Sequence, residues 1–113
     1  MHVPKDLMAA AMGPLVLSIL SRREAYGYDL VRLIREASGG HLKCRDGMIY
    51  QVLHRLKKRG WVRSKRTLVK KTVLRIYYYL TPAGKRVLND QLKPWALIYL
   101  TLKRINPKAL AEE

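Results

Sequence analysis

The chain of 113 residues is long enough for one small domain with a hydrophobic core, and its 49% hydrophobic content excludes a disordered tail. Lys and Arg number 23 against 8 Asp and Glu, a formal net charge of +15 at pH 7. Between Lys43 and Arg86 the sequence holds 14 basic residues and one acid, Asp46. Because self-repulsion on this scale opposes folding, we expect a polyanionic partner, nucleic acid before an anionic membrane surface.

The first predicted element is a helix from about Pro4 to Ser21 that is apolar on nearly every side. It is therefore expected at the centre of the fold, and Pro14 is expected to kink or divide it. Residues 7–20 resemble the apolar part of a signal peptide, but Gly13-Pro14 interrupts them and they are too short to span a bilayer. No segment is predicted to cross a membrane.

Two further helices follow, each with an apolar stripe at helical spacing. One is predicted from about Gly27 to Ser38 and ends at Gly39-Gly40. Another is predicted to start at Asp46, as its N-cap, and to stop at Gly60. The two stripes consist of Leu30, Leu33, Ile34 and Ala37 in the first and of Ile49, Val52, Leu53 and Leu56 in the second.

The period then changes, because residues 61–80 are rich in β-branched and aromatic side chains that partly alternate with polar ones. They predict a β-hairpin with its tip near Lys70-Lys71, and Tyr78 is expected to pack beneath the sheet with Leu80.

Thr81-Pro82 is typical of a helix start. A fourth helix is predicted from there to about Ile105, kinked or split at Pro94.

The predicted order is three helices, a hairpin and a long fourth helix. This order is typical of a winged helix-turn-helix protein. In such proteins the third helix enters the DNA major groove and the hairpin, or wing, lies along the neighbouring backbone. The predicted fold is thus mainly α with a small β-hairpin. Residues 1–81 are expected to form a winged helix-turn-helix DNA-binding domain, residues 82–106 a C-terminal dimerisation helix, and residues 107–113 a tail.

Three blocks, AYGYDLVRLIREASGG, GMIYQVLHRLKKRGWV and YYYLTPAGK, resemble the PadR family of transcriptional regulators in order and spacing. The resemblance extends from about Pro4 to Ile105 and is to the compact members with one helix after the wing. It implies a winged-helix homodimer that represses transcription. The family's Thr-Leu-Tyr-Pro is replaced here by Met48-Ile49-Tyr50-Gln51, and the wing tip lacks the usual glycines.

The polar side of the third helix is the expected reader of DNA, against the alternative of an ordinary solvent-exposed face. Gln51 has the donor and acceptor needed by adenine, and Tyr50 suits a phosphate or a thymine methyl. Basic wing residues are expected to bind phosphates, which raises affinity without reading sequence. The predicted DNA-binding residues are Gly47, Met48, Tyr50, Gln51, His54, Lys58, Lys65, Arg66, Lys70, Lys71 and Arg75.

The fourth helix carries apolar residues at alternating steps of four and three, which predicts a heptad-like seam against a partner helix. A two-fold homodimer is the commonest arrangement, and a helix folded back on its own domain is the alternative. The predicted dimer-interface residues are Leu88, Leu92, Trp95, Tyr99 and Leu102.

In similar compact regulators a tryptophan on this helix lines a pocket for flat aromatic ligands at the dimer centre. Trp95 stands at the matching place, and the resemblance therefore implies a pocket at Trp95 and Tyr99 for a planar aromatic small-molecule effector. An interface anchor without a ligand is the equal alternative. Asp90 is the one acid on this helix, so a neutral or anionic effector fits as well as a cationic one.

Catalytic patterns are missing from the sequence. His2, His41 and His54 are scattered, and there is no paired acid, Ser-His-Asp spacing or Gly-rich phosphate loop. We therefore expect no enzyme and no cofactor. His41 and the single cysteine, Cys44, offer two metal ligands where a closed zinc site needs four, so no metal is predicted. One cysteine allows no internal disulfide, which fits a cytoplasmic location.

The predicted function is a sequence-specific, dimeric DNA-binding repressor, with or without response to a ligand, and the sequence leaves two alternatives to it open. One is a sequence-tolerant architectural DNA-binding protein, which the high positive charge favours. The other is a small-molecule-binding module with incidental DNA affinity.

Overall fold

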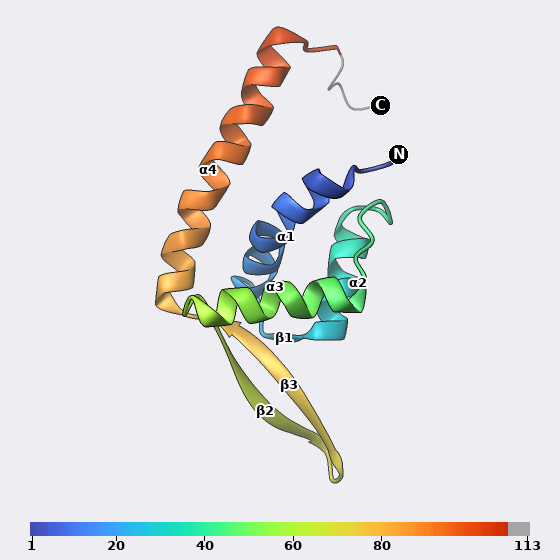
Figure 1. The fold of residues 1–113 in the computed structure, drawn as a ribbon, viewed down its shortest axis with the longest axis vertical. Coiled ribbons are helices and arrows are strands. Elements are labelled where there is room, and N and C mark those ends of the chain that lie inside the picture. The colour runs from blue at the N-terminus through green and yellow to red at the C-terminus, as the bar shows by residue number, and fades with distance from the viewer. Residues whose placement is uncertain (109–113) are drawn as a thin grey trace.

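The helices α1, α2 and α3 form a body from which two elements extend to opposite ends, the β2–β3 hairpin at one and α4 at the other (Figure 1). The computed structural model describes residues 1–108, with principal extents of 55 × 28 × 22 Å. The predicted tail, residues 107–113, lies outside the described residues from Ala109 onward. The elements are α1 Lys5–Leu20, β1 Ala25–Tyr26, α2 Gly27–Ala37, α3 Asp46–Lys58, β2 Val62–Lys70, β3 Val73–Leu80 and α4 Pro82–Ile105.

The hydrophobic core lies between the three helices of the body. The central position predicted for α1 is confirmed, because Met12, Val16 and Leu17 have no exposed surface. Its first turns are less enclosed, since Leu7 is 49% exposed. Within residues 1–108 no helix combines the length and the apolar character that crossing a membrane requires.

Helical periodicity predicted α3 better than α2. The stripe predicted for α3 is buried in full, whereas in α2 Leu33 is half-buried and Ala37 is exposed. The predicted N-cap of α3 is wrong by one residue. Arg45 is the N-cap and makes no side-chain capping bond, while Asp46 lies in the first turn. There its carboxylate faces the positive end of the helix dipole, a favourable place for an acid.

Neither proline divides its helix. α1 is continuous through Pro14, and α4 is continuous through Pro94 over 24 residues. A proline removes one backbone donor and crowds the preceding turn, but it leaves the remaining hydrogen bonds of a long helix in place. The dimerisation helix predicted from the sequence is therefore a single element.

The wing belongs to a three-stranded antiparallel sheet of order β1-β3-β2. The two-residue strand β1 was not predicted, and it pairs Ala25 with Tyr78 and Tyr26 with Tyr77. The hairpin and its tip are as predicted, since β2 ends at Lys70 and β3 begins at Val73. No non-glycine residue among those described has a positive φ, so the turn is not of type I′. A register shift between Leu68 and Lys70 accompanies it.

A close contact fixes the start of α4 against the end of α3. Thr81 is the N-cap of α4, and its hydroxyl donates to the Gly60 carbonyl at 2.7 Å while accepting from the Gly84 N–H at 3.0 Å. A Cβ atom at Gly84 would lie 2.1 Å from the Trp61 carbonyl oxygen, too close for any side chain. This contact sets the direction in which α4 leaves the body.

Candidate DNA interface

Helix α3 turns its polar side outward. Ile49 and Leu53 anchor it in the core with at most 1% of their surface exposed, whereas Gln51, His54 and Lys58 are exposed. Gly47 is exposed as well, but Met48 is half-buried and packs against the core. The outward face of the helix is therefore open along its length, with Met48 at its margin.

Tyr50 is the largest side chain on this face, with 52% of its surface exposed. Its ring lies against the first residue of α2, because a Cβ atom at Gly27 would come within 2.6 Å of the Tyr50 hydroxyl oxygen. Burial raises the pKa of Tyr78, beneath the sheet, and the neighbouring Tyr50 raises it further. Glycine at position 27 thus leaves room for Tyr50 between α2 and the wing.

The end of α3 is tied to the wing. Lys57 Nζ donates to Ser64 Oγ in β2 at 2.7 Å, and the Arg59 guanidinium lies 5.1 Å from the centre of the Trp61 ring. Such contacts hold the basic end of α3 beside the hairpin. Lys58, on the outward face, makes none of these contacts and remains exposed.

Alternation along β2 puts Lys65 and Arg66 on opposite faces of the hairpin, as expected for a strand. Lys65 Nζ pairs with Glu24 Oε2 at 2.7 Å and lies 5.9 Å from the centre of the Tyr79 ring. Lys70 and Lys71 are exposed at the tip. The wing therefore presents cations on both faces and at its end, with Lys65 already held by a carboxylate.

Arg75 has a partner that the sequence did not reveal. Its guanidinium carbon lies 4.4 Å from the centre of the Tyr26 ring. Tyr26 and Tyr77 are cross-strand partners in edge contact, with ring centres 5.6 Å apart. Only the pairing of β1 with β3 brings these side chains together, and no local pattern in the sequence marks a two-residue strand.

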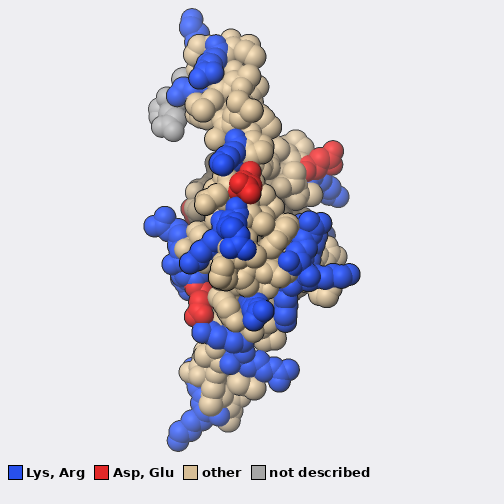
Figure 2. Space-filling model, turned by 90° about the vertical axis from the view of Figure 1, so that its left-hand side faces the viewer, with Lys and Arg blue, Asp and Glu red and all other residues tan. Residues whose placement is uncertain are grey.

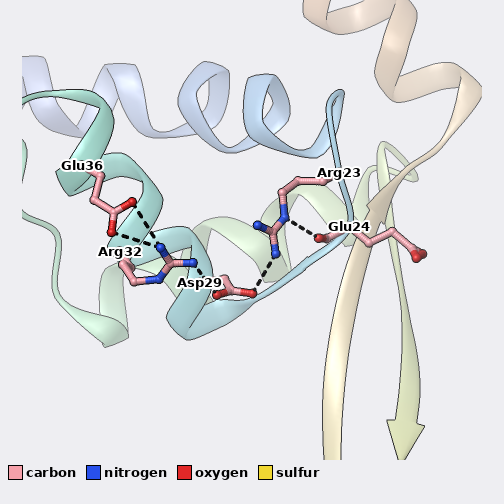
Figure 3. Close-up of polar contacts among 5 residues, drawn as sticks. All are labelled: Arg23, Glu24, Asp29, Arg32 and Glu36. Atoms are coloured by element: carbon pink, nitrogen blue, oxygen red, sulfur yellow. Dashed lines mark hydrogen bonds and ion pairs between the residues drawn. The ribbon is translucent and has the colours of Figure 1, made fainter. Parts of the chain in front are cut away.

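Both acids of α2, Asp29 and Glu36, are paired with arginines (Figure 3). Asp29, with 9% of its side chain exposed, pairs with Arg23 at 3.3 Å and with Arg32 at 3.1 Å. Arg32 also reaches Glu36 at 3.0 Å, and the hydrogen bonds to Asp29 and Glu36 raise the pKa of Arg32. These pairs leave few uncompensated negative charges on α2 to repel an anionic partner.

The basic residues are not spread evenly over the molecule. Figure 2 shows Lys and Arg gathered over the middle and the wing of one face, with a few red acidic patches among them. The upper part of the same face, formed by α4, is mainly tan with a few basic residues near its end. The excess positive charge predicted between Lys43 and Arg86 is thus a surface feature of α3 and the wing.

The predicted seam of α4 is exposed only in part. Leu92, Tyr99 and Leu102 are 41%, 47% and 52% exposed, but Leu88 is 6% exposed and belongs to the core of its own chain. Leu88 is therefore unavailable to a partner helix, contrary to the prediction. The periodicity correctly identified the apolar side of α4. At Leu88, however, that side is covered by the body of the same chain. Four further apolar residues extend the exposed surface of α4, namely Leu97, Ile98, Leu100 and Ile105.

Trp95 lies in a groove of about 520 Å³ between α1, the end of α3 and α4. Its walls include Pro14, Trp61 and Arg59, and Gln91 carries there a buried amide oxygen without a hydrogen-bond partner in the described residues. Tyr99 is not part of the lining. The predicted pairing of Trp95 with Tyr99 in one pocket is thus not formed within a single chain.

Metal-binding chemistry has little support in the described residues, where no three His, Cys, Asp or Glu side chains gather in a group. Cys44 is buried, and burial raises the pKa of its thiol. A thiol with a raised pKa is a poor nucleophile and a poor metal ligand at neutral pH.

Three helices with an exposed polar third helix and a basic two-stranded wing define the class of winged-helix transcriptional regulators. A family model described as "Transcriptional regulator PadR-like family" matches residues 16–90, well over half of the chain. The chain belongs to this family, which confirms the resemblance of the three sequence blocks. The members of this family are transcriptional regulators.

Solved structures resemble the whole fold. A transcriptional regulator from Clostridium thermocellum superposes with a TM-score of 0.82 at 23% identity, over 92% of this chain and 98% of that one. A PadR family regulator from Eggerthella lenta gives 0.75 at 27% identity, over 88% and 85%. Bacillus subtilis PadR, solved in complex with operator DNA, gives 0.65 at 28% identity, over 71% of this chain and 45% of that one.

Proposed function

We propose that the protein is a dimeric, sequence-specific DNA-binding repressor. Residues 1–81 would bind the duplex and residues 82–106 would join two copies. The observation that carries the proposal is the exposed polar face of α3 beside a wing rich in basic residues. It is supported by the similarity to Bacillus subtilis PadR, which was solved with operator DNA.

In this proposal the first half of α3 reads bases. The N-terminal residues of a recognition helix approach base edges in the major groove, and Gly47, Tyr50 and Gln51 are exposed there. Gln51 would pair with adenine, and His54 follows one turn later. Lys58, Arg66 and the tip lysines would bind phosphates, which orients the protein without selecting a sequence.

The dimer is supported by the amount of apolar surface on α4. A helix exposing Leu92, Tyr99 and Leu102 on one side gains stability when a second copy covers that side. Two-fold symmetry is the simplest closed arrangement for identical chains. It would place two recognition helices about one DNA turn apart, roughly 34 Å, and so favour a palindromic site.

An effector would bind in the groove beside Trp95. The two tryptophans that line the groove, Trp61 and Trp95, suit a planar aromatic molecule. The unpaired amide oxygen of Gln91 would accept a hydrogen bond from that molecule. Because α4 forms one wall, an occupied groove would alter the angle between the two DNA-binding units and so release the DNA. A titration with cationic, neutral and anionic planar dyes tests this through Trp95 fluorescence in a Trp61→Phe background; Trp95→Phe in the otherwise unchanged chain, which keeps Trp61, is the control.

The experiment that tests the function is selection of binding sites from random duplexes. A recovered palindrome with half-sites about one turn apart is expected from the two recognition helices. Repeating the selection with Gln51→Ala should relax the preference at one position of each half-site. Equal affinity for the selected and for random duplexes at about 150 mM salt would refute sequence-specific repression.

That refuting result would favour the second candidate, a sequence-tolerant architectural DNA-binding protein. The net charge of +15 supports it, because phosphate neutralisation alone gives strong and non-specific binding.

A further inference from the structure

Another groove, of about 310 Å³, lies between α1 and α2. It is bounded by side chains from residues 15–22 of α1, from residues 34–38 at the end of α2, and by Leu42. It shares no residue with the groove beside Trp95. We call it the α1–α2 groove.

The apolar pattern of the two helices makes this groove apolar. Leu15 and Ile19 are four residues apart and therefore lie on one side of α1. From α2 come Ile34 and Ala37, which belong to its predicted stripe. Ile34 is 1% exposed and connects the groove to the hydrophobic core, whereas Ala37 is exposed. Alanine is too small to fill the space, so the apolar side of α2 stays uncovered at its end.

The turn after α2 fixes one wall of the α1–α2 groove. Gly39 and Gly40 have φ values of 63° and 88°, which glycine adopts without strain, and they bring the chain back past the end of α2. Ser38 Oγ then accepts a hydrogen bond from the Leu42 N–H at 2.8 Å and donates to the Arg35 carbonyl at 3.0 Å. Leu42 is thus held in place before any ligand arrives.

Arg22 is the one charged residue in the lining. No ion pair among residues 1–108 includes Arg22, although its neighbour Arg23 pairs with Asp29. Ser18 lies one turn before Arg22 on α1 and adds a hydroxyl to the same side. With a cation, a hydroxyl donor and no acid, the polar part of the groove suits an anion.

We propose that the α1–α2 groove binds a small aliphatic carboxylate, such as a medium-chain fatty acid. The hydrocarbon chain packs against Leu15, Ile19 and Leu42. The carboxylate pairs with Arg22 and accepts a hydrogen bond from the Ser18 hydroxyl. Because no aromatic ring lines the groove, it fits a flexible chain better than the planar molecule proposed for the groove beside Trp95. Its volume is at the lower end of the range for ligand pockets, about 300 to 1,000 Å³, so the chain must be short.

A second copy of the protein is the competing occupant, because the outer half of α4 is also apolar. That part of α4 carries Lys103 and Arg104 in its last turn. In the α1–α2 groove these cations would approach Arg22, and like charges brought together oppose association. Charge therefore favours the free carboxylate.

Isothermal titration calorimetry of the full chain with hexanoate, octanoate and decanoate tests the proposal. The affinity should rise by up to about fourfold for each added methylene until the groove is full. Octanoate should bind about fivefold more tightly than 1-octanol, which has the same chain without the charge. Octylammonium should bind most weakly. Equal affinity for the three eight-carbon compounds would refute the selection of a carboxylate.

Two arginine variants separate the contact at Arg22 from the effect of the net charge. Arg22→Gln should weaken octanoate binding about fivefold and leave 1-octanol binding unchanged. Arg35→Gln is the matched control, because it removes the same charge from an exposed side chain of α2 that does not line the groove. The control should bind octanoate like the wild type, and equal losses in both variants would refute the contact.

A larger side chain at Ala37 tests the groove itself. Ala37→Leu should abolish the binding of octanoate and of 1-octanol, because leucine occupies the space of the hydrocarbon chain. Ala9→Leu is the control, at an exposed position of α1 outside both grooves. Both variants should fold, since leucine is a good helix former at an exposed position. Undiminished octanoate binding by Ala37→Leu would refute the site, and a dimer weakened by Ala37→Leu alone would assign the groove to a second copy.

Nuclear magnetic resonance of the labelled chain locates the ligand. Octanoate should shift the backbone amide signals of Ser18, Ala37 and Leu42 and leave the indole N–H signals of Trp61 and Trp95 in place. Shifted indole signals with unchanged amides would place the ligand in the other groove and overturn the proposal. The inference does not depend on DNA binding, so the preference for a selected duplex and the binding of octanoate can each fail alone.

Discussion

The wing and the outer half of α4 extend from the same body in opposite directions, and their surfaces differ in kind (Figure 1). The wing, residues 62–80, carries six basic residues and no acid. The outer half of α4 exposes leucines, isoleucines and a tyrosine, with its cations concentrated near the end. A net charge for the whole chain conceals this difference, because one end suits a polyanion and the other suits a second apolar helix.

The comparison also shows how the two ends are coupled. Both meet at the contact between Gly60, Thr81 and Gly84, where the end of α3, the base of the wing and the start of α4 lie within hydrogen-bonding distance. A change in the direction of α4 can therefore reach α3 through this contact, and also through α1, which packs against both helices. The predictions below test each end and then the contact between them.

The largest effect is expected from acids placed on the apolar end. Leu92→Asp with Tyr99→Asp should weaken the dimer at least about a hundredfold, because each change would bury an unpaired carboxylate at the interface. DNA affinity should fall with it, since two linked recognition helices bind more tightly than two separate ones. Analytical ultracentrifugation and binding of the selected duplex measure the two effects.

Lys93→Asp is the control for these variants. It adds an acid to the same helix at a side chain that is 78% exposed and lies near Asp90 rather than on the seam. The control should remain dimeric. A wild type that is monomeric at micromolar concentration would contradict the role of α4, and so would a dimer unaffected by the two acids.

The second effect concerns the contact between the two ends. Gly84→Ala should lower the free energy of unfolding by about 3 kcal/mol, because the new Cβ would overlap the Trp61 carbonyl oxygen and the backbone must shift. Gly47→Ala is the matched control, since a Cβ there meets no atom within 4 Å. It should be neutral or slightly stabilising, as alanine in a helix usually is. Equal stability of the two variants in urea unfolding would contradict the tight contact.

The third effect concerns the charged end. Lys70→Ala with Lys71→Ala should weaken binding to every duplex and lower the salt slope by up to about two units, because two phosphate contacts are lost. Lys103→Ala with Arg104→Ala removes the same charge from the end of α4 and should leave the slope unchanged. A similar loss in both variants would mean that only net charge matters and that the wing tip makes no contact with DNA.

The sequence was sufficient to predict an element when the pattern of that element's own residues determines its structure. The α3 stripe of Ile49 and Leu53 follows from the helical period alone, and the hairpin follows from alternation and β-branched residues. Periodicity shows which side of a helix is apolar, but not which neighbour covers it. For this reason Leu88 was assigned to a partner helix although its own chain buries it.

The features that the sequence did not predict depend on contacts between segments that are distant in the sequence. β1 has only two residues, too few for any alternation to be visible, yet it places Tyr26 beside Arg75 and Glu24 beside Lys65. Neither pair can be predicted without the register of the sheet. The predicted phosphate-binding residues, by contrast, were chosen from charge alone and stay a prediction.

The smallest effect is expected from the ion pair of Glu24 and Lys65. Glu24 holds Lys65 Nζ at 2.7 Å, with about half of each side chain exposed. An exposed pair of this kind contributes little to stability, so Glu24→Gln should leave the fold intact and free Lys65 for phosphate. DNA affinity should rise about threefold at low salt and return toward the wild type at high salt.

Glu36→Gln provides the comparison, because it removes the same charge from the far end of α2, where Glu36 pairs with Arg32. If the two variants gain affinity equally, the effect is one of net charge. A gain confined to Glu24→Gln would show that an acid beside the wing tempers DNA binding even on its strongly basic surface. The affinity of the wing for DNA would then depend on how many cations it carries and also on which of them are free of ion pairs.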